Sequence, residues 1–148
     1  IDSVAAWNNK GKFNNEKLSD EQVWLRGQYQ KILQVCQSEK AITQGQFYDL
    51  MYVNADRSRF DDTKLYAYMR KYKNELILVV ANFGDKDAHA SVRIPQHLFD
   101  FWQIKPQNAT NAVDLLTAER LIYPLNPDSC IPMQIPGNQS RIIKFVLE

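Results

Sequence analysis

The chain has 148 residues, of which 45% are hydrophobic and 24% charged, and its formal net charge is +1. This length suits one domain, or one domain plus a remnant of another, and a domain of this size buries roughly 70% of its unfolded surface without needing a disulfide or metal. The near-neutral charge argues against a nucleic-acid or membrane-surface partner, because both require a basic excess. No apolar stretch approaches the roughly 20 residues of a membrane span.

The chain begins at Ile1 and carries no signal-peptide pattern, so we expect a piece of a longer protein. Residues 1–18 are polar and predict a loop. A helix is predicted from Asp20 to Ser38, because Ser19 and Gln22 form a capping box and apolar residues then recur every three or four positions. This apolar stripe consists of Trp24, Leu25, Tyr29, Ile32, Leu33 and Cys36.

After Gly45 the apolar period changes to two, which predicts strands. Strands are expected at 46–53, 64–72, in the run "ELILVVANFGD" (75–85), and at 88–94, with Lys73-Asn74 as a tight connection. This order predicts an antiparallel meander.

The run "ELILVVANFGD" is apolar on both faces of its strand, since Leu76 to Val80 are consecutive apolar residues. A strand with one wet face would alternate instead. We therefore expect a central strand of the larger sheet, with one face on a second sheet and the other on the helix or on a missing domain.

Residues 96–111 are predicted to be irregular, with a possible short helical turn at 97–104. A strand is predicted at 112–116 and a final strand at 141–148. Between them, four prolines from Pro124 to Pro136 are expected to break the chain into short pieces. The predicted fold class is mainly β: an antiparallel, Greek-key-like β-sandwich of about seven or eight strands, preceded by one amphipathic α-helix.

Catalytic chemistry is not indicated by the residues. His89 and His97 are expected in structural or surface roles, and the adjacent pair Asp61-Asp62 in a turn. Cys36 and Cys130 form no metal-binding spacing, so they are either free thiols or one disulfide. No cofactor and no metal site is predicted.

Tryptophan rings could stack on the apolar face of a sugar. Trp24 is better explained by a core or interface position, and Trp102 by a core position, with sugar contact by Trp102 as the alternative. The aromatic residues are scattered along the predicted strands and do not cluster in one loop.

Several segments, taken in order, carry a family resemblance: "WNNKGKFNNEKLS" (7–19), "LRGQYQKILQVCQSEKAI" (25–42), "GQFYDL" (45–50), "FDDTKLYAYMR" (60–70), "NFGD" (82–85) and "DLLTAE" (114–119). Together they resemble the C-terminal end of the α-amylase family of glycoside hydrolases, including the last helix of its catalytic barrel. The chain departs from the family at Ala118, where Gly is usual, and it contains none of the family's catalytic carboxylate segments.

The resemblance implies a domain division: residues 1–40 as a remnant of the barrel end, and residues 41–148 as a C-terminal β-sandwich. It implies a non-catalytic domain that packs on and stabilises the barrel of a starch- or maltodextrin-degrading enzyme. The alternative is a carbohydrate-binding module that contacts α-glucans through surface aromatics. A bacterial parent enzyme would then be periplasmic or extracellular.

The expected partners are the missing barrel, an α-glucan, or a second copy of the chain joined through the apolar helix face. In the isolated chain we expect that face to pack partly on the sandwich and partly on another molecule.

Overall fold

The computed structural model describes residues 18–147. The chain divides between Cys36 and Gln37 into two compact units, and each is considered by itself. The loop predicted before Leu18, including Trp7, lies outside the described residues.

Helix α2 spans Asp20–Ser38, as the sequence predicted. Its capping box is formed: the Ser19 backbone N–H donates to Gln22 Oε1 at 3.0 Å, and the Gln22 N–H donates to Ser19 Oγ at 3.2 Å. These two bonds satisfy backbone groups that a helix start otherwise leaves without partners. No residue of α2 is buried, so what covers its apolar stripe stays a prediction.

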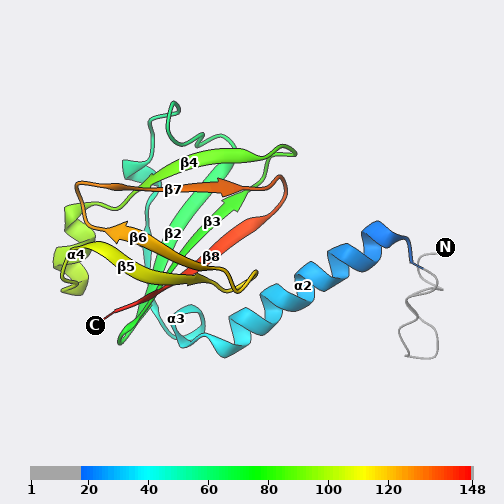
Figure 1. Ribbon diagram of the computed structural model, residues 1–148, viewed down its shortest axis with the longest axis horizontal. Helices are drawn as coiled ribbons and strands as arrows, with labels where there is room; N and C mark the ends of the chain where they lie inside the picture. The colour runs from blue at the N-terminus through cyan, green and yellow to red at the C-terminus, as the bar shows by residue number, and fades with distance from the viewer. Residues whose placement is uncertain (1–17, 148) are drawn as a thin grey trace. The chain divides into compact units, whose positions relative to one another are not determined.

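The second unit is an antiparallel β-sandwich of eight strands, which confirms the predicted fold class. The larger sheet has the strand order β1-β2-β3-β8-β5-β6, and the smaller sheet pairs β4 with β7 and crosses in front of the larger one in Figure 1. The elements are α3 (Lys40–Thr43), β1 (Gln46–Asp49), the 3-10 helix η2 (Met51–Val53), β2 (Leu65–Tyr72), β3 (Glu75–Asn82), β4 (Ala88–Arg93), α4 (Gln96–Trp102), β5 (Gln107–Asp114), β6 (Arg120–Leu125), β7 (Cys130–Ile135) and β8 (Ser140–Val146).

Strand β3 is central in the larger sheet, between β2 and β8, as predicted from its apolar run. Leu76, Leu78 and Val80 belong to the core between the two sheets and are fully buried. On the opposite face, Ile77 is fully buried and Val79 is 7% exposed. Both faces of β3 are therefore covered.

The short helix α3, which was not predicted from the sequence, covers part of the outer face of β3. It packs against β2 and β3. Arg70 on β2 donates from Nε to the Ala41 carbonyl at 3.1 Å and from Nη2 to the Ile42 carbonyl at 2.7 Å. The turn that follows needs glycine, because a Cβ on Gly45 would lie 2.1 Å from the Ala41 carbonyl oxygen.

The meander prediction holds for β1, β2 and β3 but is wrong for β4, which pairs with β7 in the other sheet. The edge of β3 that does not pair with β2 pairs with β8 instead. Ile142 and Ile143 of β8 are buried on opposite faces of the sheet and so continue the two buried faces of β3. Strand β4 instead alternates buried Ala90 and Val92 with exposed His89, so it suits a sheet with one wet face.

Two further predictions are corrected. The strand predicted at 46–53 ends at Asp49, because the Asp49 carboxylate accepts the Met51 N–H at 3.0 Å and turns the chain into η2. The strand predicted at 112–116 begins much earlier, at Gln107, in a segment expected to be irregular, and ends at Asp114. The helical turn predicted near residue 97 is present as α4.

Candidate functional site

An open hollow of about 360 Å³ lies beside the edge strand β1, and we call it the aromatic hollow. Three elements supply its walls: β1, the η2 helix that follows it directly, and α4, which is distant from both in the sequence. The lining residues are Phe47, Tyr48, Asp49, Tyr52, His97 and Phe101.

Local structure places these side chains. The turn made by Asp49 brings Tyr52, on η2, back beside Tyr48 on β1. His97 and Phe101 are four residues apart on α4, which puts them on the same helix face. Their rings stack with centroids 6.0 Å apart and planes inclined by 12°.

Tyr48 on β1 forms hydrogen bonds to residues of the other two elements, η2 and α4. Its hydroxyl lies 2.6 Å from the Tyr52 hydroxyl and 2.8 Å from His97 Nδ1. Burial, with a smaller contribution from the hydrogen bond to Tyr52, raises the pKa of Tyr48 well above its ordinary value of 10.0. The phenol is therefore protonated over the whole neutral range and fixes the positions of its two neighbours.

The outer rings of the hollow are open to solvent. Tyr52 is 59% exposed, Phe101 is 56% exposed and Phe47 is 49% exposed, whereas Tyr48 is 9% exposed. Large aromatic rings gathered around a hollow in this way are typical of binding surfaces.

Trp102, the predicted sugar-contacting residue, lies behind this hollow in the core and is 6% exposed. Its ring meets Tyr48 edge-on at 5.6 Å, and its Nε1–H donates to Gln46 Oε1 at 2.8 Å. The solvent-exposed ring at this position in the hollow belongs instead to its neighbour, Phe101. The sequence contained a weak signal for this arrangement, in the four-residue spacings of Tyr48 with Tyr52 and of His97 with Phe101.

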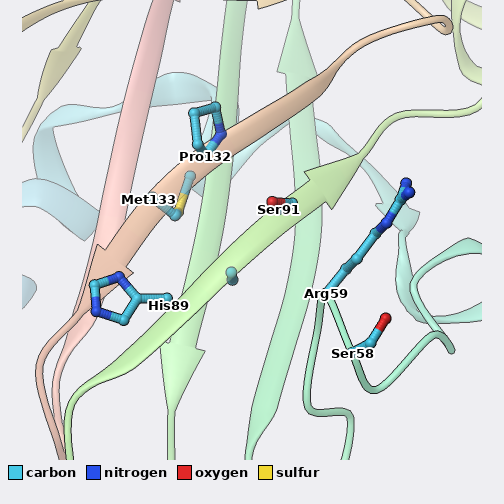
Figure 2. Close-up of a pocket in the computed structure, with 7 residues that line it drawn as sticks. Ser58, Arg59, His89, Ser91, Pro132 and Met133 are labelled. Carbon is cyan, nitrogen blue, oxygen red and sulfur yellow. The ribbon is translucent and has the colours of Figure 1, made fainter.

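A second hollow, of about 410 Å³, lies over the small sheet. Figure 2 shows its His89 and Arg59 at opposite ends, with side chains that do not converge. Ser91 and Met133 lie between them and add no aromatic ring to this surface.

The adjacent carboxylates Asp61 and Asp62 make local contacts. Asp61 accepts the Thr63 N–H at 3.1 Å in a turn, and Asp62 pairs with Arg57 at 2.8 Å. Cys36 and Cys130 are free thiols. Residues 18–147 contain no group of three or more His, Cys, Asp or Glu side chains placed to hold a metal ion. Within the same range, no helix is both long enough and apolar enough to span a membrane.

No protein-family model and no curated protein sequence matches the chain. Solved structures do match it. An α-amylase from Anoxybacillus aligns with a TM-score of 0.59 and 12% identity, over 95% of this chain and 26% of the enzyme. The maltogenic α-amylase AmyB from Thermotoga neapolitana gives 0.57 and 11%, over 93% of this chain and 29% of the enzyme.

The α-amylase from Geobacillus thermoleovorans, whose structure contains acarbose, gives a TM-score of 0.55 at 14% identity, over 78% of this chain and 21% of the enzyme. The chain thus spans between a fifth and three tenths of the length of these enzymes. At such identities the likeness shows the fold, which is that of one part of several α-amylases, and it confirms at this level the resemblance found in the sequence.

Proposed function

We propose that this chain is the non-catalytic C-terminal domain of an α-amylase-family glycoside hydrolase, and that it packs on and stabilises a catalytic barrel. The observation that carries the proposal is the fold match, which covers most of this chain and only 21–29% of each α-amylase. The remaining length of such an enzyme is ample for a barrel of about 250 residues.

The apolar stripe of α2 supports the proposal. Trp24, Leu25, Tyr29 and Leu33 are each 48–59% exposed. Leaving a large apolar side chain in water forgoes roughly 1.5–3 kcal/mol, so such a stripe is expected to contact a partner. In the parent enzyme that partner is the barrel, and in the isolated chain the stripe is expected to pack partly on the sandwich and partly on a second copy.

Three observations test the proposal. The pure chain should release no reducing sugar from starch or maltotriose, and release of it contradicts the non-catalytic role. The reading frame upstream of residue 1 should encode a catalytic barrel, and deleting residues 41–148 from the parent enzyme should lower its melting temperature. An upstream sequence without a barrel overturns the proposal.

Sedimentation tests the role of α2. The intact chain should associate, and a chain that begins at Gln37 should not. This truncation keeps Glu39, whose carboxylate holds Lys144 Nζ at 2.6 Å, so the sandwich retains its own contacts. Equal association of the two chains would show that the helix face binds no second copy.

A second candidate function is non-catalytic binding of α-glucans, and the exposed rings of the aromatic hollow favour it. Calorimetric titration of the whole chain with maltoheptaose tests it, because a domain that serves only to support a barrel should release no heat of binding.

A further inference from the structure

We propose that the aromatic hollow is the α-glucan contact site, with Phe101 and Tyr52 as stacking platforms and Asp49 and His97 as hydrogen-bonding groups. This inference rests on the second candidate function above and assigns it to particular residues. It also moves the sugar contact from Trp102, which is buried, to residues that were not predicted from the sequence to contact sugar.

The shape of the hollow fits a sugar ring. Tyr48 is the most buried of its rings, and the ring centroids of Tyr52 and Phe101 each lie 6.4 Å from that of Tyr48. A pyranose has flat C–H faces and a rim of hydroxyl groups, so it matches aromatic rings set beside polar atoms. The volume of about 360 Å³ is at the lower end of the range of about 300–1,000 Å³ for small-ligand pockets.

The charge of the lining selects a neutral ligand. Neither Lys nor Arg lines the hollow, and the only carboxylate is Asp49. An anionic ligand such as a phosphate would meet this carboxylate with no cation to offset it. Sugar hydroxyls, in contrast, can donate to the carboxylate and accept from a ring N–H or a phenol.

The platform is already held in position before any ligand arrives. The Tyr48 hydroxyl is bonded to Tyr52 and to His97, and His97 in turn stacks on Phe101. Binding therefore needs little reordering of side chains, which removes a cost that otherwise weakens association.

The test is calorimetric titration of the full chain with maltoheptaose, using Phe101→Ala, Tyr52→Ala and Tyr52→Phe. Each alanine variant should raise the Kd at least about tenfold, which corresponds to about 1.4 kcal/mol. Tyr52→Phe keeps the ring and should lose less. The matched control is Phe83→Ala, because Phe83 is 76% exposed but does not line the hollow, and its Kd should equal that of the wild type.

The outcomes separate the proposals. If the chain binds maltoheptaose and the hollow variants bind it equally well, the site is elsewhere and this inference is wrong, while the second candidate function stands. If the wild type binds no maltoheptaose, the inference and that function both fail, and the barrel-packing proposal is unaffected. Binding of choline in place of maltoheptaose would identify a cation–π pocket and overturn the sugar assignment. Variants that change only the sedimentation of the chain would identify a protein interface and overturn it as well.

Discussion

Asn82 is predicted to be a principal link between the two sheets. It ends β3, is 2% exposed, and its Nδ2 group reaches the carbonyls of Lys86 at 2.9 Å, Ile135 at 3.0 Å and Pro136 at 3.3 Å. Its Oδ1 accepts the Gly84 N–H at 2.9 Å. One side chain thus holds the turn after β3 and the end of β7 together.

The expected loss follows from these bonds. An amide NH₂ has two hydrogens, so the three carbonyl contacts count as two full hydrogen bonds, and the Gly84 contact is a third. At about 1 kcal/mol net for each bond, Asn82→Ala should lower the free energy of unfolding by about 3 kcal/mol. The carbonyl of Ile135 would also be left buried without this donor, which adds to the loss.

Urea denaturation followed by circular dichroism measures this loss. The matched control is Asn111→Ala, because Asn111 is exposed on β5 and its replacement should change stability by less than about 0.5 kcal/mol. An effect at Asn82 no larger than that at Asn111 would refute the assignment of Asn82 as a link between the sheets.

A second variant gives a pH signature. Asn82→Asp keeps the side-chain shape but turns a carboxylate oxygen toward carbonyl groups, which should raise the folded-state pKa above the unfolded value of about 3.9. A raised carboxyl pKa means that the folded state binds more protons. Relative to the wild type, the variant should therefore be most stable below the unfolded pKa and should lose stability as the pH rises through the folded one. The same pH dependence in the wild type would show that residue 82 is not its source.

Three further substitutions should change stability. Leu78→Ala should cost about 2–5 kcal/mol in urea denaturation, because Leu78 is fully buried, and a loss below about 0.5 kcal/mol would contradict its core position. Arg141→Met should cost about 3–5 kcal/mol, because it removes the cation whose Nε lies 3.1 Å from Oδ2 of the fully buried Asp114. Adding Asp114→Asn to this variant should recover part of the loss. If stability does not recover, the two side chains do not act as a charge pair. Ala118→Gly should raise the melting temperature and the free energy of unfolding, the latter by about 0.5–1 kcal/mol, because Ala118 has a φ of 63° in an exposed turn. An unchanged or lower melting temperature would show that this turn is unstrained.

Features set by neighbouring residues could be predicted from the sequence alone. Helix α2 runs from Asp20 to Ser38 as predicted, because the signals of a capping box and an apolar stripe lie within the helix itself. The tight connection at Lys73-Asn74 joins β2 to β3, with Tyr72 opposite Glu75. The burial of Leu76–Val80 on both faces could be predicted because five consecutive apolar residues leave no polar face for the strand to expose to solvent.

Pairing partners and the aromatic hollow were decided only by the tertiary structure. An alternating strand such as β4 fits any sheet that offers one buried face, so its sequence does not distinguish β3 from β7 as a neighbour. The hollow depends on a contact between Tyr48 and His97, which are 49 residues apart. Local patterns determine which way a side chain points from its own element, but the groups it meets there are selected by the packing of elements that are distant in the sequence.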